Sequence, residues 1–303
     1  MRLRQRASCA LLALSAIGLM ACQKPAATTE ASTTAPANAF ETGSLRAVVI
    51  GSALPMVEKA GTTYDGLSFV VLDAIRDQMK TAPRAKADQF SIEPVAVASA
   101  REGLDKIRSG EADIACGVAF SWERQRTLDF TIPFASGGVR VLAPKGTDGT
   151  PDSLKGKTIG VVQNSVAANV LAASIDDAQF QFFEGPEQAL AALKGGEISL
   201  LGGDSLWLKA HRASTAPDAV LVPDRAYARS GVGCVVGDST PHLLNVSNLA
   251  IGRLLSAYVA NDPAVRTEVN RWIGSGSAVD LKDDQISTFY GMVLSTTAQF
   301  NTK

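Results

Sequence analysis

The feature that most restricts the fold is a pattern of strand-like runs and helical periods that occurs twice along the chain. In the first set the strand-like runs are residues 45–52, 90–97 and 112–118, with helical periodicity between them. In the second set they are residues 158–162, 180–183 and 198–202. Strands that alternate with helices form mainly parallel sheets with helices on their faces. The sequence therefore predicts an α/β protein with two similar halves.

Two further apolar segments, residues 139–144 and 231–236, bracket the second set. If each segment crosses between the halves, the second lobe is an insertion into the first. Helical patterns at about 241–259, 263–272 and 283–299 follow, and they must then pack back on the first lobe. We expect residues 44–140 and 235–300 to form lobe 1 and residues 141–234 to form lobe 2.

Composition agrees with a packed protein large enough for two domains. The chain has 303 residues, of which 46% are hydrophobic and 19% are charged. Its formal net charge is −1, so it lacks the basic surface that nucleic-acid binding requires. We expect no nucleic-acid partner.

The N-terminal residues have the pattern of an export signal. Arg2, Arg4 and Arg6 precede an apolar segment at 8–20 that is too short to span a bilayer comfortably. The segment ends in Leu-Met-Ala-Cys22, which resembles the lipobox of bacterial lipoproteins; ordinary cleavage after small residues is the alternative. We expect a signal peptide at 1–21, lipidation of Cys22, and a periplasmic or cell-surface protein anchored to the membrane by its N-terminal lipid. Residues 22–43 are rich in Ala, Thr and Pro and predict a flexible tether.

Two cysteines remain outside the signal and the lipobox. In an exported protein, Cys116 and Cys234 can form a disulfide. Both also lie in apolar strand-like runs, where a free buried thiol fits equally well. The sequence leaves both states open.

Three blocks of sequence resemble the bacterial extracellular solute-binding proteins of family 3, the amino-acid-binding type that serves ABC importers. The blocks are GEADIACGVAFSWERQRTLDFTIPF (110–134), DSLKGKTIGVVQNS (152–165) and ALAALKGGEISLLGGD (189–204), in the order that the family has them. The resemblance implies the two-lobe type 2 periplasmic binding protein fold, joined by two crossing strands. It also implies a monomer that closes around a small polar solute, an amino acid or related carboxylate, and delivers it to an ABC permease.

Two charged residues are the main candidates for ligand binding. By the resemblance, Arg124 holds the ligand α-carboxylate, which a guanidinium can bind with two parallel hydrogen bonds. Asp204 follows a lobe 2 strand and, by the resemblance, accepts from the α-ammonium. The alternatives are a surface arginine beside Glu123 and an aspartate that only caps the helix after it.

The other candidates follow the ends of strands. Asn164 and Ser165 lie where the strand 158–162 turns into a helix, whose N-terminus offers free N–H groups to an anion; Ser165 could instead only cap that helix. The resemblance adds Gly117, Ala119, Ser121 and Val166. Ala119 and Val166 stand where the family often has a small hydroxyl, so the identity of the solute stays open.

Other chemistries have little support in the sequence. His211 and His242 are far apart and no Cys/His cluster occurs, so we expect no metal and no cofactor. We expect a binding protein rather than an enzyme. The alternatives are a dehydratase on the same scaffold, in which Asp204 would be the acid or base, and an orphan sensor or adaptor.

Overall fold

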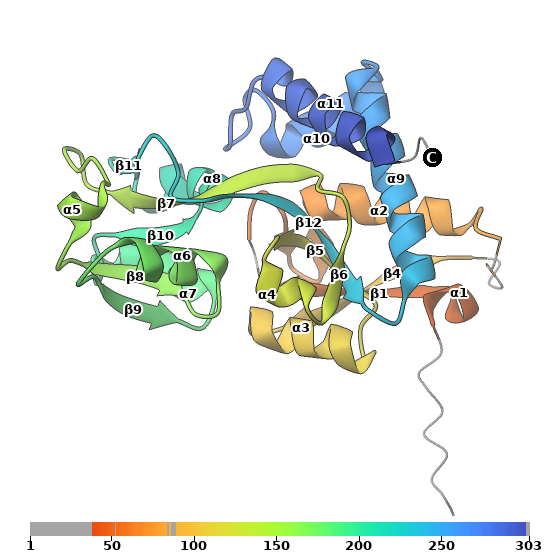
Figure 1. The fold of residues 1–303 in the computed structure, drawn as a ribbon, viewed down its shortest axis with the longest axis horizontal. Helices are drawn as coiled ribbons and strands as arrows, with labels where there is room; N and C mark the ends of the chain where they lie inside the picture. The colour runs from red at the N-terminus through yellow and green to blue at the C-terminus, as the bar shows by residue number, and fades with distance from the viewer. Residues whose placement is uncertain (1–37, 52, 84, 86–88, 301–303) are drawn as a thin grey trace, which may run out of the picture. The chain divides into compact units, whose positions relative to one another are not determined.

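The computed structural model describes residues 38–51, 53–83, 85 and 89–300; side chains are described to residue 296. Its main sheet has the strand order β4-β1-β5-β12-β7-β10-β8-β9, with β6 and β11 paired beside this path (Figure 1). We call the part around β1 lobe 1 and the part around β8 lobe 2. The strands are β1 (Ser44–Ile50), β4 (Ser91–Val97), β5 (Ile114–Ala119), β6 (Leu128–Phe130), β7 (Ala135–Ala143), β8 (Thr158–Val162), β9 (Gln179–Phe183), β10 (Leu201–Asp204), β11 (Val220–Val222) and β12 (Arg229–Gly237).

The sheet is parallel within each lobe and antiparallel where the lobes join. β1 pairs in parallel with β4 and β5, and β8 pairs in parallel with β9 and β10. The long strands β7 and β12 pair antiparallel with each other, and each also pairs antiparallel with a strand of one lobe. The expected lobe boundaries fall inside these two strands. The exact boundaries remain a prediction.

In each lobe, helices cover both faces of the sheet. In lobe 1, α2 (Leu67–Met79), α9 (Pro241–Val259), α10 (Pro263–Ile273) and α11 (Asp283–Phe300) share one apolar core, while α3 (Ala100–Ser109) packs on the opposite face. In lobe 2, α6 (Val166–Ser174) covers one face, and α7 (Pro186–Lys194) and α8 (Ser205–Thr215) cover the other. The three helices after residue 240 therefore pack in the lobe 1 core.

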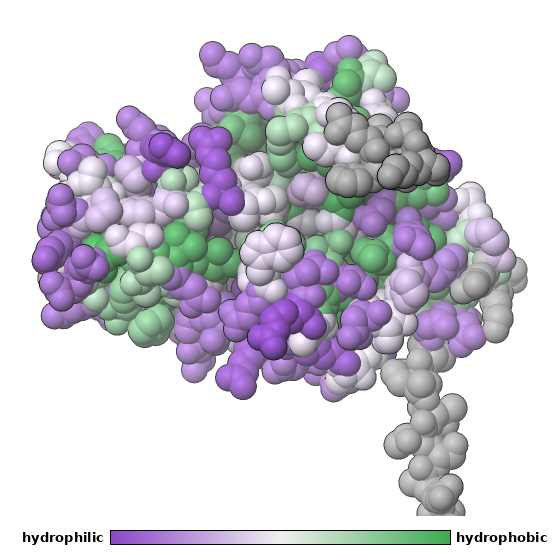
Figure 2. All heavy atoms as spheres, viewed as in Figure 1, coloured by the Kyte–Doolittle hydropathy of each residue, from purple (hydrophilic) through white to green (hydrophobic). Residues whose placement is uncertain are grey.

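Short elements complete the chain. They are α1 (Ala39–Thr42), α4 (Trp122–Gln125), α5 (Pro151–Leu154) and the hairpin of β2 (Glu58–Ala60) and β3 (Thr63–Asp65). No single helix of the described residues is long and apolar enough to cross a membrane; α9 and α10 meet that test only together, across a bend of 98°. Figure 2 shows hydrophilic residues over most of the visible surface, with smaller apolar areas among them.

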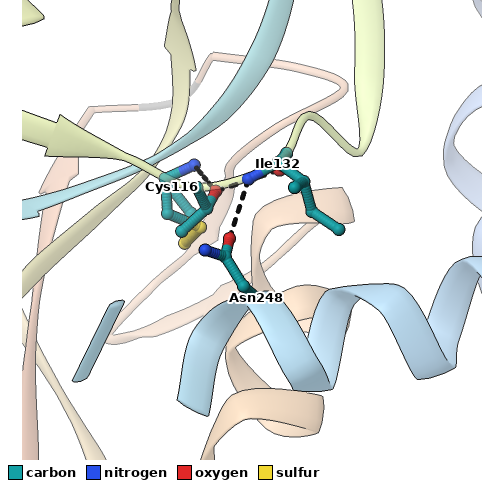
Figure 3. Close-up of a disulfide and its surroundings, with 5 residues drawn as sticks. Cys116, Ile132 and Asn248 are labelled. Carbon is teal, nitrogen blue, oxygen red and sulfur yellow. Dashed lines mark hydrogen bonds between the residues drawn. A yellow bond between two sulfur atoms is a disulfide. The ribbon is translucent and has the colours of Figure 1, made fainter. Parts of the chain in front are cut away.

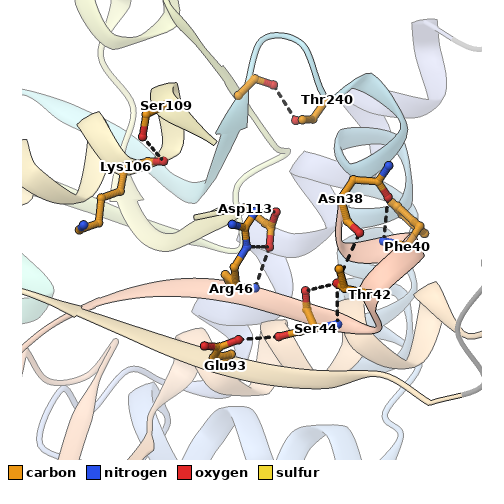
Figure 4. A network of polar contacts seen from close by, with 11 residues as sticks. Asn38, Phe40, Thr42, Ser44, Arg46, Glu93, Lys106, Ser109, Asp113 and Thr240 are labelled. Atoms are coloured by element: carbon orange, nitrogen blue, oxygen red, sulfur yellow. Dashed lines mark hydrogen bonds and ion pairs between the residues drawn. The ribbon is translucent and has the colours of Figure 1, made fainter. Parts of the chain in front are cut away.

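The folded part begins earlier than the sequence predicts. The expected tether extends to residue 43, yet Phe40 of α1 is buried and its ring lies 4.4 Å from that of His242. Asn38 caps α1, because its Oδ1 accepts a hydrogen bond from Phe40 N (Figure 4). Ala39 and Phe40 are both part of the lobe 1 core, which the composition of the segment alone does not indicate. The expected signal, Cys22 and the rest of the tether lie outside the described residues.

The predicted strand at 198–202 is also corrected. β10 begins at Leu201, because the N–H of Ile198 instead bonds to the carbonyl of Ala192 and closes the end of α7. Ile198 and Leu200 are nevertheless buried, which explains why their apolar pattern suggested a strand.

An ion pair links the starts of two lobe 1 strands, at the opposite edge of the sheet from the ends of those strands. The guanidinium of Arg46 on β1 donates to both carboxylate oxygens of Asp113, at 3.0 and 2.7 Å, and Arg46 N donates to Oδ2 at 2.8 Å (Figure 4). A bidentate pair of this kind fixes orientation as well as contributing attraction. It holds the start of β5 against β1, so that both strands end at the same edge.

Candidate functional site

A cavity of about 250 Å³ opens where the strands of both lobes end. Lobe 1 contributes Met56, Gly117, Ala119 and Arg124 to its lining. Lobe 2 contributes Ser165, Val166, Glu184, Asp204 and Trp207, and the crossing strands add Val139 and Ser230. The ends of strands in open α/β sheets are where ligands collect. Six of the residues expected to bind ligand line this one cavity: Gly117, Ala119, Arg124, Ser165, Val166 and Asp204.

Arg124 reaches from lobe 1 to lobe 2. It lies in α4, whose N-cap Ser121 accepts from Arg124 N. Its Nη1 donates to the carbonyl of Ala119 at 3.1 Å, and its Nη2 donates to the carbonyl of Asn164 in lobe 2, also at 3.1 Å. Both acceptors are uncharged, and burial lowers the pKa of the guanidinium. A carboxylate placed here would supply the counter-charge and offset that desolvation.

Asp204 ends β10 and caps α8. Its Oδ1 accepts from Leu206 N at 2.9 Å, so the capping interpretation is correct, and the side chain also lines the cavity. Burial raises the pKa of this carboxyl to about 6, although nearby backbone N–H groups act in the opposite direction. The backbone of Gly137 lies so close that a Cβ there would come within 1.8 Å of Oδ2. Glycine at 137 is therefore required for this placement.

The turn into α6 presents unpaired N–H groups to the cavity. Asn164 has φ 57°, a left-handed conformation that asparagine tolerates better than most residues. Ser165 caps the helix through Ala168 N at 3.1 Å. Within the described part of the chain, no residue accepts from the N–H of Val166 or Ala167, and both residues line the cavity. First-turn N–H groups lack partners inside a helix and favour an anion. Asn164 itself contributes its carbonyl to Arg124 rather than lining the cavity.

Gly117 shapes the floor of the cavity. Its φ is 86°, and a Cβ would lie 2.9 Å from Ser68 Oγ and 3.0 Å from Met56 Cβ. A larger residue would therefore displace the loop that carries Met56. Ala119 lines the cavity and its carbonyl accepts from Arg124.

Ser121, like Asn164, does not line this cavity. With Phe120 and Trp122, it lines a neighbouring cavity of about 430 Å³ on the side of the crossing strands. The two cavities share Val139, Val166 and Ser230. Trp122 is 79% exposed, and its ring meets Phe120 edge-on at 4.8 Å.

Among the lining residues that were missed from the sequence, four have a polar group in the side chain: Gln163, Glu184, Trp207 and Ser230. Gln163 and Glu184 directly follow β8 and β9, so the rule that ligands collect at strand ends could have found them. Ser230 precedes the apolar run that marked β12. Trp207 is reached only through the start of α8, for which the sequence offers no separate signal.

The comparisons with known proteins identify the family. The model for bacterial extracellular solute-binding proteins, family 3, matches residues 45–279. The chain belongs to this family. The resemblance read from the three blocks is thereby confirmed, and with it the class of extracellular solute-binding proteins.

Individual relatives are distant. The virulence sensor protein BvgS of Bordetella pertussis is 28% identical over 183 residues, which cover 59% of this chain and 14% of that protein. The L-cystine-binding protein TcyJ of Escherichia coli K12 is 25% identical over 161 residues, 52% of this chain and 58% of that protein. The ABC transporter arginine-binding protein 1 of the same strain is 27% identical over 49% of this chain and 62% of its own length. The chain thus spans less than two thirds of each.

Solved structures confirm the predicted fold. The ancestral amino-acid-binding protein AncCDT-1, described as a precursor of cyclohexadienyl dehydratase, superposes with a TM-score of 0.65 and 18% identity, covering 78% of this chain and 98% of that one. A mutant of the arginine-binding protein of T. maritima has the same TM-score at 17% identity, with 77% and 96% covered. The chain has the two-lobe type 2 periplasmic binding protein fold.

Proposed function

We propose that this protein binds an amino acid or a closely related carboxylate between its two lobes and delivers it for ABC-type import. The observation that carries the proposal is Arg124, a half-buried cation from lobe 1 that lines the cavity and hydrogen-bonds across to lobe 2. Among the described residues its guanidinium hydrogen-bonds to two carbonyl oxygens, and Val166 and Ala167 at the start of α6, whose N–H groups have no acceptor there, line the same cavity. These groups together suit a ligand carboxylate.

Asp204 supports the amino-acid form of the proposal. A carboxylate beside the cavity is the acceptor that an α-ammonium needs. Binding of a cation would favour the ionised form, which burial otherwise disfavours. The named relatives that bind cystine and arginine agree with an amino acid as the class of solute.

Ligand contacts from both lobes provide the mechanism. A ligand drives closure only through contacts that exist in the closed state and not in the open one. Arg124 belongs to lobe 1, whereas Asp204 and the start of α6 belong to lobe 2. An amino acid that engages all three would therefore stabilise the closed arrangement.

The experiment is a thermal-shift screen of amino acids and organic acids followed by calorimetry with Arg124→Lys. Ligand at 100 times its Kd should stabilise the protein by about 2.7 kcal/mol. Lysine keeps the charge but not two parallel donors, and a charge-assisted bond contributes on the order of 1.5 to 3 kcal/mol. Affinity should therefore fall more than tenfold.

Arg126→Lys is the matched control, because Arg126 is an exposed arginine two residues away in the same short helix region. It should bind like the wild type. Unchanged affinity in Arg124→Lys, with the fold intact, would refute the role of Arg124 and with it the amino-acid proposal.

Two other functions each have one supporting observation. The match to a virulence sensor agrees with a sensor or adaptor, and loss of uptake on deletion of the gene would separate import from that role. The raised pKa of Asp204 agrees with acid catalysis by a dehydratase-like enzyme. Turnover of arogenate or prephenate would favour the enzyme, and recovery of unchanged ligand after binding would favour the carrier.

A further inference from the structure

Apolar residues of both lobes line part of the cavity, which we call its apolar end. Its lining there consists of Ala53, Pro55 and Met56 from the first loop of lobe 1, Ala100 at the start of α3, and Val162 and Pro186 in lobe 2. The two lobes come together here. A Cβ at Gly185, next to Pro186, would lie 3.6 Å from the carbonyl of Ala98 near Ala100.

Hydrogen bonds hold the lobe 1 side of this end in place. Ala53 N donates to the carbonyl of Val57 at 2.7 Å, and Met56 N donates to that of Ala53 at 3.0 Å. The start of α2 adds two more bonds, since Leu67 N and Ser68 N donate to the carbonyls of Pro55 and Met56. These hydrogen bonds occupy backbone N–H and carbonyl groups of the loop, which are then not available to a ligand. The described residues of the loop that line the cavity, Ala53, Pro55 and Met56, offer apolar surface to a ligand.

Among the charged residues that line the cavity, Glu184 is the nearest in sequence to the residues of the apolar end. Glu184 is exposed. An exposed carboxylate attracts a cation weakly, because water screens the pair. By contrast, a buried cationic side chain would lose its hydration among Ala53, Met56 and Val162 without a buried acceptor. A methylene group gains from the same surroundings, about fourfold in affinity when fully buried.

We propose that the site selects an α-amino acid with an uncharged aliphatic or thioether side chain over one with a cationic side chain of equal length. This inference rests on the proposed function, because it assumes that Arg124 and Asp204 hold the α-carboxylate and the α-ammonium. The side chain then lies at the apolar end, against Met56 from one lobe and Val162 and Pro186 from the other.

The test is calorimetry of the mature wild-type protein with L-norleucine and L-lysine, which share a carbon chain and differ by the terminal ammonium. We expect norleucine to bind at least tenfold more tightly. In the series L-alanine, L-2-aminobutyrate, L-norvaline and L-norleucine, affinity should rise about threefold to fourfold per methylene. A flat series, or tighter binding of lysine that Glu184→Gln abolishes, would overturn the proposal.

A variant locates the effect. Met56→Ala should weaken norleucine binding at least fivefold and change alanine binding less than twofold, because alanine does not reach the apolar end. The matched control is Met292→Ala, an exposed methionine on α11 that lies outside this cavity. Equal losses for norleucine and alanine in Met56→Ala would contradict the assignment. If Met56→Ala does not fold, the ligand series on the wild type decides.

The outcomes also separate this inference from the proposed function. If lysine or glutamate binds more tightly than norleucine, the protein is an amino-acid binder and only the selectivity is wrong. If no amino acid binds, both are wrong.

Discussion

Asp204 combines two demands that act on its charge in opposite directions. As an N-cap it accepts from Leu206 N, and backbone donors stabilise an anion. Burial beside the cavity disfavours the same anion. This effect is larger than that of the backbone donors, so the pKa of the Asp204 carboxyl is raised to about 6. The unliganded protein therefore holds a carboxylate that costs free energy when ionised. A bound cation would remove much of that cost, so part of the binding free energy comes from relieving it.

The first prediction is a pH-dependent gain in stability for Asp204→Asn without ligand. The pKa is raised on folding, so the native state binds the proton more tightly, and wild-type stability falls as pH rises from about 4 to about 6. Asparagine is neutral and caps a helix as well as aspartate does. At pH 7 the variant should be more stable by on the order of 3 kcal/mol, and the difference should vanish near pH 4.

Urea unfolding at several pH values measures this difference. Asp262→Asn is the control, since Asp262 caps α10 in an exposed position and accepts from Ala264 N and Val265 N. Its effect should be small at every pH. A difference for Asp204→Asn that does not change between pH 4 and pH 7 would show that burial of the charge is not the cause.

At the scale of elements, the sequence predicts the long helices and the central strands well because their apolar periodicity is sustained. α9, α10 and α11 begin and end within about one residue of the expected positions. Elements of three or four residues, such as α4, β6 and β11, are too short to carry a period. Apolar periodicity also leaves the antiparallel pairing of β7 and β12 undetermined, because strand direction depends on the path of the whole chain.

The candidate site was predictable only in part, because some of its residues are brought together by packing and not by a local sequence pattern. Arg124 and Asp204 stood out through a sequence motif, whereas Trp207 enters the cavity through the packing of α8 against the sheet. Such packing joins residues distant in sequence and leaves no local pattern. Ser121 shows the converse. It lies inside the motif, but α4 turns it toward the neighbouring cavity.

The second prediction concerns the link between β5 and β12. The structure joins Cys116 to Cys234 by a disulfide, near the point where Asn248 of α9 accepts from Ile132 N (Figure 3). The two cysteines are 118 residues apart, so the bond closes a long loop in the unfolded chain. Replacing both by alanine should lower the free energy of unfolding by about 2 to 4 kcal/mol.

Urea unfolding with and without reductant provides the internal control for that variant. Reductant should destabilise the wild type by a similar amount and leave the double variant unchanged. Two free thiols on titration of the unfolded, unreduced wild type would instead support the buried-thiol interpretation.

At the scale of the whole molecule, the expected attachment site and the residues that line the cavity lie far apart in the sequence. The apolar core of lobe 1 includes Leu206 and Ala210 of α8, so the lobes already share packing beside the crossing strands. The cavity lies on described residues that begin well after Cys22. The proposed lipid anchor should therefore fix the protein to a membrane without taking part in binding.

The last prediction tests that separation. Cys22→Ser removes the thiol that the lipid would modify, so the protein should move from the membrane fraction to the soluble fraction while its ligand affinity stays within twofold. Cys9→Ser is the matched control, because Cys9 lies within the expected signal and should leave anchoring unchanged. Fractionation with immunoblotting and mass spectrometry of the mature N-terminus measure both effects. A mature chain that begins elsewhere, or Cys22→Ser protein that stays on the membrane, would refute lipidation.

Shortening the tether is a related test with a structural limit. A deletion that ends before Asn38 should preserve the fold, whereas one that removes Phe40 should destabilise it, because that side chain is part of the lobe 1 core.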